Sequence, residues 1–118
     1  MEKIKVLIAD DHRVVREGLA AILKTKDDIN VVGEAQDGVE AVEKTKTLMP
    51  DVILMDVSMP RMGGIEATRQ IKREFPHMGI VALTMYEEQQ YIFDLVRAGA
   101  TGYLLKDSES SQIVAAIR

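Results

Sequence analysis

The chain has 118 residues, a formal net charge of −4 at pH 7 and no cysteine. This length fits one domain with one hydrophobic core. The acidic balance argues against a nucleic-acid-binding surface, which needs a basic patch, and the lack of cysteine excludes disulfide scaffolds, cysteine-bound zinc and thiol catalysis. No stretch approaches the ~20 apolar residues that span a bilayer, and the first residues lack the pattern of a signal peptide. We therefore expect a cytoplasmic protein that makes no membrane contact.

Five short apolar runs rich in β-branched residues recur along the chain and predict β-strands. Four runs are nearly all apolar, which is typical of parallel strands covered on both faces. The second run is more polar and is expected at an edge of the sheet. The runs are Ile4–Ala9, Ile29–Ala35, Val52–Met55, Ile80–Leu83 and Tyr103–Leu105.

Each run is followed by a segment whose apolar residues recur with the period of an amphipathic helix. Pro50 and Pro76 mark the ends of the second and third helices, and Gly99 is expected to cap the C-terminus of the fourth. Asp107 or Ser108 is expected to cap the N-terminus of the fifth helix. The apolar stripes are Val15, Leu19, Ile22 and Leu23; Val39, Val42 and Leu48; Ile65, Thr68, Ile71 and Phe75; Ile92, Leu95 and Val96; and Ile113, Val114 and Ile117.

Strict alternation of strands and helices predicts an open parallel sheet with right-handed crossovers. For five strands we expect a single doubly wound (βα)5 domain of the flavodoxin-like α/β class, with helices on both faces and strand order 2-1-3-4-5. Residues 1–118 are expected to form this one domain. Ligands of such sheets bind at the carboxyl ends of the strands.

Polar side chains stand at the carboxyl ends of four predicted strands. Asp10 and Asp11 follow the first strand, Asp56 the third, Thr84 the fourth and Lys106 the fifth. Each residue alone has an ordinary explanation, because an aspartate before a helix is usually a cap and a lysine is usually solvated. Since strands 1, 3, 4 and 5 are neighbours in the predicted order, the five side chains are nevertheless expected to meet at one edge of the sheet.

Such a cluster favours phosphoryl transfer. Three neighbouring carboxylates repel one another, and a bound divalent cation relieves the repulsion. Mg²⁺ takes one or two carboxylates and leaves room for a phosphate oxygen. We therefore expect Asp10 and Asp11 to serve the metal and Asp56, the central carboxylate, to attack phosphorus. Lys106 and the Thr84 hydroxyl are expected to bind the remaining phosphoryl oxygens.

Other catalytic signatures are absent from the sequence. It contains no Gly-rich nucleotide-binding motif and no GxSxG nucleophile elbow. The two histidines, His12 and His77, are isolated in the sequence and are interpreted as surface residues rather than metal ligands.

Several segments, in order and at family spacing, resemble the motifs of response regulator receiver domains over essentially the whole chain. They are VLIADDH, VILMDVSMPRMGG, ALT and GYLLK. The resemblance implies that Asp56 accepts a phosphoryl group from a sensor histidine kinase. It also implies Mg²⁺ bound by Asp11, Asp56 and the backbone carbonyl of Ser58, and by Asp10 through water.

The same resemblance implies a conformational switch. Thr84 and Tyr103 would form the switch pair, in which the hydroxyl moves to the phosphate and the aromatic ring turns inward. The output would be the face of the fourth helix, fifth strand and fifth helix. The segments ADDHRVVREGL, LTMY and GYLLKD are similar to the subfamily whose receiver precedes a LuxR-type helix-turn-helix. Phosphorylation is then expected to control transcription, by releasing or dimerising a DNA-binding domain beyond residue 118.

The chain differs from many receiver domains at two positions. Asp107 stands where many members have proline after a cis peptide bond, and Met85 stands where many have a small residue. Met85 is expected to crowd the acceptor. Ser58 and Tyr86 occupy positions that tune phosphate lifetime in the family.

Two other functions stay open from the sequence. A constitutive interaction module would use the fourth-helix face without phosphate, but it would not need the acidic cluster, Thr84 and Lys106 together. A Mg²⁺-dependent phosphohydrolase using Asp56 would need a general acid and a substrate pocket, for which the sequence offers no convincing candidate. The leading prediction is a switch that catalyses only its own phosphorylation and dephosphorylation.

Overall fold

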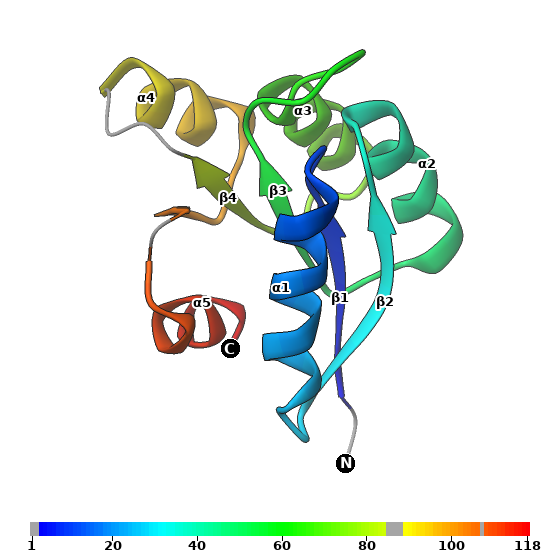
Figure 1. The fold of residues 1–118 in the computed structure, drawn as a ribbon. Coiled ribbons are helices and arrows are strands. Elements are labelled where there is room, and N and C mark those ends of the chain that lie inside the picture. Colours follow the sequence, from blue (N-terminus) through cyan, green and yellow to red (C-terminus); the bar gives the residue numbers. More distant parts are fainter. Residues whose placement is uncertain (1–2, 85–88, 107) are drawn as a thin grey trace.

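The computed structural model describes residues 3–84, 89–106 and 108–118, in which five β-strands alternate with five α-helices (Figure 1). The strands are β1 (Ile4–Ala9), β2 (Ile29–Ala35), β3 (Val52–Asp56), β4 (Gly79–Thr84) and β5 (Gly102–Leu105). The helices are α1 (Arg13–Lys24), α2 (Gly38–Leu48), α3 (Gly64–Glu74), α4 (Gln89–Ala98) and α5 (Ser110–Ile117). Every predicted strand and helix is present. β3 and β4 each extend one residue beyond the C-terminal end of their apolar runs, because the parallel pairing continues to Asp56 and Thr84. β4 and β5 also begin one residue early, at Gly79 and Gly102.

All five strands are parallel, and their order in the sheet is β2-β1-β3-β4-β5. This order confirms the predicted doubly wound α/β fold. β2, the most polar run, lies at one edge as expected, and the register between β1 and β2 shifts between Val6 and Leu7.

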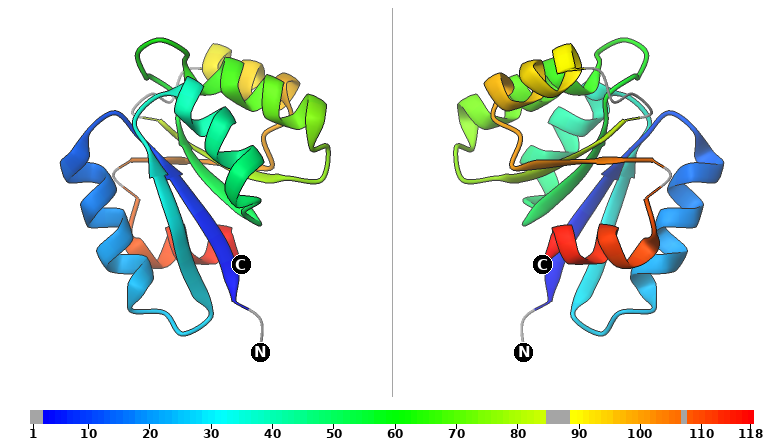
Figure 2. Two further views of the ribbon diagram at one scale, coloured as in Figure 1. Left: turned by 90° about the vertical axis from the view of Figure 1, so that its right-hand side faces the viewer. Right: turned by 90° about the vertical axis from the view of Figure 1, so that its left-hand side faces the viewer.

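Helices cover both faces of the sheet. α1 and α5 pack on one face, and α2, α3 and α4 pack on the other (Figure 2). Alternate side chains of β1 enter the two cores: Val6 and Ile8 face α1 and α5, whereas Leu7 and Ala9 face α2 and α3. Because both faces are covered, the central strands read as nearly continuous apolar runs.

The ends of the helices follow the predicted signals except at α5. Gly99 has φ +104° and donates its N–H to the carbonyls of Leu95 and Val96, which confirms the glycine cap of α4. Pro50 follows Met49, the left-handed C-cap of α2, and Pro76 follows the C-cap of α3.

The predicted cap of α5 is wrong, because Glu109 is its N-cap residue rather than Asp107 or Ser108. The Ser108 N–H donates to the Leu105 carbonyl at 3.0 Å and so belongs to the turn after β5. The Glu109 N–H donates to the Gln112 side chain at 3.2 Å, as in a capping box. Asp107 lies outside the described residues. The helix therefore begins at Ser110, one or two residues later than the predicted caps imply.

An ion pair holds the far end of α5. Arg118 donates from Nε and Nη2 to the two carboxylate oxygens of Asp28, both at 2.8 Å. The hydrogen bond from Arg118 outweighs the cost of partial burial and lowers the pKa of Asp28. Asp28 immediately precedes β2, so this contact lies at the end of the sheet opposite the carboxyl ends of the strands. No helix within the described ranges is long and apolar enough to cross a membrane.

Candidate functional site

Four neighbouring strands place polar residues at their carboxyl ends, and this side of the sheet is called the acidic edge below. Asp10 follows the last residue of β1, Asp56 ends β3, Thr84 ends β4 and Lys106 follows β5. The backbone continues the ladder here, because the Lys106 N–H donates to the Thr84 carbonyl at 2.9 Å. The strand order therefore converts four positions distant in sequence into one local group, as predicted.

Asp10, Asp56 and Lys106 form a buried group of three charges. The Lys106 Nζ lies 3.1 Å from Asp10 Oδ2 and 3.1 Å from Asp56 Oδ1. Asp10 is fully buried, and Asp56 is 2% exposed. One ammonium thus faces two carboxylates, which leaves net negative charge in a place shielded from water.

Burial and the surplus negative charge shift the pKa values of Asp56 and Lys106. Burial, and then the charge of Asp10, raise the pKa of the Asp56 carboxyl to about 6, although Lys106 opposes the shift. Burial alone would lower the pKa of the Lys106 ammonium. Its contact with Asp10 and the charge of Asp56 outweigh burial, so its pKa lies above its ordinary value.

Two carboxylate oxygens in this group have an unmet hydrogen-bonding capacity. Asp10 Oδ2 and Asp56 Oδ2 are both buried and have no hydrogen-bond partner among the described residues, although Asp10 Oδ2 faces the Lys106 ammonium at 3.1 Å. The other oxygen of Asp56, Oδ1, accepts a long hydrogen bond of 3.4 Å from the Ser58 N–H and contacts Lys106. A buried carboxylate oxygen without a donor is costly, and a cation or an incoming electrophile would satisfy it.

Asp11 and His12 complete the group on its exposed side. The carboxylates of Asp10, Asp11 and Asp56 and the imidazole of His12 each offer one ligand atom, and these atoms all lie within 4.8 Å of one another. The three aspartates fit the oxygen donors that Mg²⁺ prefers. The expected metal cluster is therefore assembled from the predicted aspartates.

His12 is a surface residue, as interpreted from the sequence, with its side chain 67% exposed. In space, however, it lies beside two aspartates. Its Nδ1 lies 3.1 Å from Asp11 Oδ1 and 3.4 Å from Asp10 Oδ1. The signal that sequence reasoning missed is its place directly after Asp10-Asp11, where the chain turns from β1 into α1.

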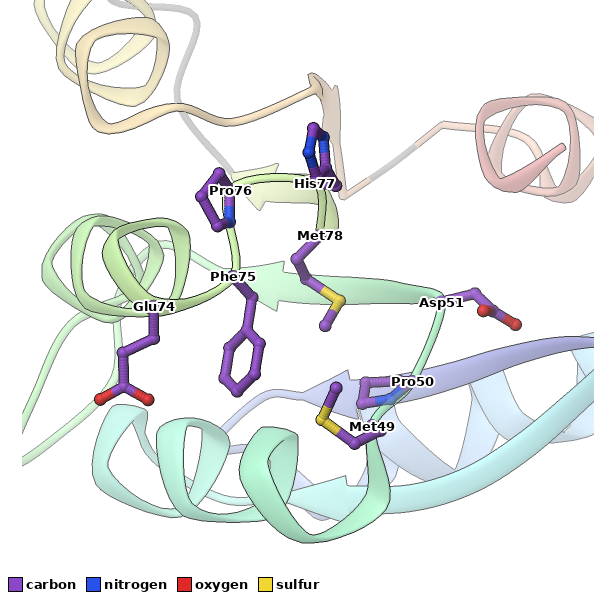
Figure 3. Close-up of a pocket in the computed structure, with 8 residues that line it drawn as sticks. All are labelled: Met49, Pro50, Asp51, Glu74, Phe75, Pro76, His77 and Met78. Atoms are coloured by element: carbon purple, nitrogen blue, oxygen red, sulfur yellow. The ribbon is translucent and has the colours of Figure 1, made fainter.

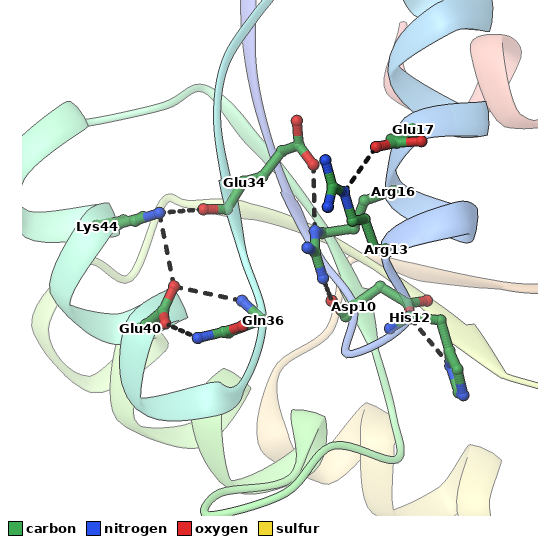
Figure 4. A network of polar contacts seen from close by, with 9 residues as sticks. All are labelled: Asp10, His12, Arg13, Arg16, Glu17, Glu34, Gln36, Glu40 and Lys44. Carbon is green, nitrogen blue, oxygen red and sulfur yellow. Dashed lines mark hydrogen bonds and ion pairs between the residues drawn. The ribbon is translucent and has the colours of Figure 1, made fainter.

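Hydrogen bonds fix the turn that carries these residues (Figure 4). Asp10 Oδ1 accepts the His12 N–H at 2.8 Å, and the Asp10 carbonyl accepts a hydrogen bond from Arg16 Nη1 at 2.6 Å. Arg16 also donates from Nε to Glu34 at 3.1 Å, and the Glu34 carbonyl accepts a hydrogen bond from Lys44. Arg16 thereby ties the acidic turn to β2, a role that its sequence position in α1 did not reveal.

The loop that follows Asp56 is tied to its surroundings by a second arginine. Arg61 adopts a left-handed conformation with φ +62° and donates from Nε to Asp37 Oδ2 at 2.9 Å. Asp37 is itself the N-cap of α2 and accepts the Glu40 N–H at 2.9 Å. Burial would raise the pKa of Asp37, but the hydrogen bonds from Glu40 and Arg61 outweigh it and the pKa lies below its ordinary value.

Gly64 allows α3 to begin directly against the end of β3. A Cβ atom at this position would lie 2.0 Å from the Asp56 carbonyl oxygen, a distance that real side chains do not adopt. The Gly64 N–H donates to the Val57 carbonyl at 2.8 Å. The second glycine of the MPRMGG segment, Gly64, is therefore needed for close packing behind Asp56.

The remaining predicted site residues differ in how far their side chains are exposed. Thr84 is buried, at 1% exposure, at the end of β4. Ser58 is exposed and follows Asp56 by two residues, and Tyr103 on β5 is 45% exposed. Tyr103 is thus not part of the acidic group. Met85, Tyr86 and the Lys106–Asp107 peptide bond, which the sequence analysis considered, lie outside the described residues.

A separate hollow of about 370 Å³ lies at the opposite end of the sheet (Figure 3). Two carboxylates on its rim already have partners: Asp51 accepts the Lys5 N–H at 2.8 Å, and Glu74 pairs with Lys46 at 3.2 Å. Its lining is mostly apolar, so it lacks the converging charged groups of the acidic edge. The lining residues are Met49, Pro50, Asp51, Glu74, Phe75, Pro76, His77 and Met78.

Comparison with known proteins agrees with the fold. The family model of the response regulator receiver domain matches residues 6–118. The chain is 50% identical over 115 residues to the transcriptional regulatory protein LiaR of Bacillus subtilis, covering 98% of this chain and 54% of LiaR. It is 47% identical over 116 residues to the oxygen regulatory protein NreC of Staphylococcus carnosus, covering 98% of this chain and 54% of NreC. The chain thus spans about half the length of these curated relatives.

Solved structures give the same result. The signal receiver domain of NarL from Mycobacterium tuberculosis superposes with a TM-score of 0.95 at 36% identity, covering 99% of this chain and 94% of that one. A LuxR-family two-component response regulator from Aurantimonas superposes with a TM-score of 0.93 at 34% identity, covering 98% of this chain and 83% of that one. This chain belongs to the response regulator receiver domain family, among relatives of the LuxR class.

Proposed function

We propose that this chain is a phosphorylation-controlled switch in which Asp56 accepts a phosphoryl group from a sensor histidine kinase in a Mg²⁺-dependent reaction. The observation that carries the proposal is the buried Oδ2 of Asp56, which has no hydrogen-bond partner in the described part of the chain and lies beside Lys106 and two further aspartates. A receiver domain is a signalling module rather than an enzyme for an external substrate. On this proposal the chain catalyses only its own phosphorylation and dephosphorylation.

In the proposed reaction an oxygen of Asp56 forms a bond to phosphorus while the bond between phosphorus and the kinase imidazole nitrogen breaks. The electron pair of the broken bond stays on that nitrogen, and the product on Asp56 is an acyl phosphate. Lys106, within 3.1 Å of Asp56, is suited to neutralise one phosphoryl oxygen. The Thr84 hydroxyl is the proposed donor to another.

Mg²⁺, when bound, would neutralise the charge that develops on the phosphoryl oxygens. We infer that Asp11, Asp56 and the Ser58 carbonyl hold it directly and that Asp10 holds it through water. Asp10 has a further role in this chain, because its side chain accepts the His12 N–H and so orders the turn that presents Asp11. The fit is supported by the spacing of the carboxylates.

The proposed response runs from Thr84 to the face of α4, β5 and α5. Movement of the Thr84 hydroxyl to the phosphoryl group would open space that the Tyr103 ring can occupy. The exposed ring of Tyr103 and the exposed apolar side chains of Phe93 and Val96 on α4 give this face a surface that can change partners.

We further propose that the natural protein continues into a DNA-binding output domain. The chain spans about half of relatives that are named transcriptional regulatory proteins, and its own net charge is −4. DNA contact would then belong to that second domain, and phosphorylation would act by releasing it or by pairing two copies. The complete protein would act in the cytoplasm.

The test is covalent labelling with a small phosphoryl donor such as acetyl phosphate, read by intact mass. The wild type is expected to gain one phosphoryl group in Mg²⁺ and none in EDTA. Asp56→Asn is expected to gain none, because an amide oxygen is a poor nucleophile toward phosphorus. Asp51→Asn, at the opposite end of β3, is the matched control and should label as the wild type does. Undiminished labelling of Asp56→Asn would remove Asp56 as the acceptor.

A further inference from the structure

The imidazole of His12 belongs to the acidic group by position but has no part in the reaction proposed above. Its Nδ1 lies 3.1 Å from Asp11 Oδ1 and 3.4 Å from Asp10 Oδ1. His12 occupies the N-cap position of α1, but its side chain makes no capping hydrogen bond. The ring is therefore available to whatever binds between the aspartates.

The backbone holds the ring in this place. The His12 N–H donates to Asp10 Oδ1 at 2.8 Å, and the His12 carbonyl accepts the Arg16 N–H as the first hydrogen bond of α1. The Arg16 side chain also binds the Asp10 carbonyl. The backbone of His12 is thus held on both sides, so its imidazole can reach only positions close to Asp11.

The distance between His12 and Asp11 agrees with ligation of a single ion. Two ligands at right angles on an ion with bonds of ~2.1 Å lie about 3.0 Å apart, and opposite ligands lie about 4.2 Å apart. His12 Nδ1 is 3.1 Å from Asp11 Oδ1, as adjacent ligands would be. The whole group of four potential ligand atoms spans up to 4.8 Å, so it would have to tighten on an ion, with Asp10 bound through water. The buried Asp56 Oδ2, for which residues 3–84, 89–106 and 108–118 supply no hydrogen-bond partner, independently favours a cation here.

We propose that His12 supplies a nitrogen ligand to this site, so that it binds first-row transition-metal ions such as Mn²⁺ and Ni²⁺ as well as Mg²⁺. Mg²⁺ favours oxygen ligands and retains its water, whereas imidazole suits the later ions of the row. The exposed Nε2 side of the ring can donate its proton to water while Nδ1 ligates. The inference rests on the proposed metal site and adds a residue and an ion class to it.

The first test compares ion affinities by titration calorimetry, with protein that carries no polyhistidine tag. The wild type, His12→Ala and His77→Ala are each titrated with Ni²⁺ and with Mg²⁺. In His12→Ala the ratio of Ni²⁺ to Mg²⁺ affinity is expected to fall by ~10–100-fold, comparable to the loss when a partner of a metal ligand is removed. His77→Ala is the matched control, because His77 lies at the opposite end of the sheet, and it should keep the wild-type ratio.

The second test detects the metal–nitrogen bond directly. Electron spin-echo spectra of bound Mn²⁺ are expected to contain nitrogen coupling in the wild type and in His77→Ala, and to lose it in His12→Ala. Wild-type Mn²⁺ without nitrogen coupling, or an unchanged affinity ratio in His12→Ala, would overturn the proposal and leave His12 as an ion-pair partner of Asp11. Labelling of Asp56 in Mg²⁺ is measured separately, so the proposed function can survive that result.

Discussion

Asp56 ionises in surroundings that disfavour its charge. The residue is 2% exposed, and its nearest charged neighbours are another buried carboxylate, Asp10, and one ammonium, Lys106. In the unfolded chain the same carboxyl is surrounded by water. Folding therefore moves an aspartate into a site where it binds its proton more tightly, and this links stability to pH.

The sign of this link gives a prediction for the metal-free protein. The pKa of Asp56 is raised from 3.8 to about 6 in the folded state, so its effect on stability is most favourable below pH ~4 and is lost as pH rises through ~6. In EDTA, Asp56→Asn is expected to unfold with a free energy about 2–3 kcal/mol above that of the wild type at pH 8. The difference should shrink toward pH 4. Urea unfolding at several pH values measures it.

The control for this experiment is Asp51→Asn. Asp51 is exposed just before the other end of β3, where its side chain accepts the Lys5 N–H. Its replacement should give no comparable gain at pH 8. A gain for Asp56→Asn that is the same at pH 4 and pH 8 would contradict the assignment of the effect to ionisation.

Single residues of the site differ in how far sequence reasoning could reach them. Asp10, Asp56 and Lys106 were predictable because they end apolar runs whose strands must be neighbours. The roles of Arg16 and Arg61 were not, because each depends on the path of a loop and on a partner 18 or 24 residues away. Long flexible side chains can reach many partners, and only the folded backbone selects one.

The connection from β3 to α3 is the most tightly packed element of the site. Gly64 begins α3 against the Asp56 carbonyl, and Arg61 ties the same loop to the N-cap of α2. The Gly38 N–H donates to the Met62 carbonyl at 2.9 Å, which adds a backbone link between the two loops. Asp56 is thus held by the start of α3 as well as by its own strand.

This packing predicts opposite outcomes for two glycine substitutions. Gly64→Ala should lower the free energy of unfolding by about 1–3 kcal/mol or more, because the new Cβ would meet backbone atoms that cannot yield cheaply. Gly18→Ala, within α1, has nothing within 4 Å of the new Cβ and should raise stability by about 0.5–1 kcal/mol. Equal effects of the two substitutions in urea unfolding would show that α3 can move away from Asp56 at little cost.

The elements themselves were largely predictable from the sequence. Strands buried on both faces leave long apolar runs, and Gly99 and the two prolines mark helix ends by their backbone restrictions. The start of α5 was mispredicted, because Asp107 and Ser108 belong to the residue types preferred as N-caps and Glu109 does not. The choice is made by which N–H the turn after β5 uses, a competition between hydrogen bonds that residue type does not determine.

At the scale of the molecule, the two ends of the sheet have different characters. The carboxyl ends of the strands carry the buried charges, and the opposite end carries the mostly apolar hollow beside Phe75 and Met78. Asp10 follows β1 and Asp56 ends β3, and both are interior strands of the sheet. Repulsion within the charge cluster therefore lowers the stability of the whole fold.

This repulsion predicts stabilisation of the whole domain by Mg²⁺. An ion that binds only the folded state adds about 2.7 kcal/mol to the free energy of unfolding at 100 times its dissociation constant. The melting temperature of the wild type should therefore rise by several degrees in Mg²⁺, and much less in Asp11→Asn. NaCl of equal ionic strength is the control, because screening alone would act in both salts. An equal rise in NaCl would contradict specific binding.

The pair between Arg118 and Asp28 has a consequence for the design of sensors. Because it anchors the end of α5 beside the turn before β2, a dye or reporter attached next to this pair, with Arg118 and Asp28 both kept, would sit at the far end of the sheet from Asp56. Such a label would not touch a phosphoryl group or a metal ion at the acidic edge. Any change in its signal on phosphorylation would have to be transmitted through the fold, which makes this position suited to separating mechanical transmission from local chemistry.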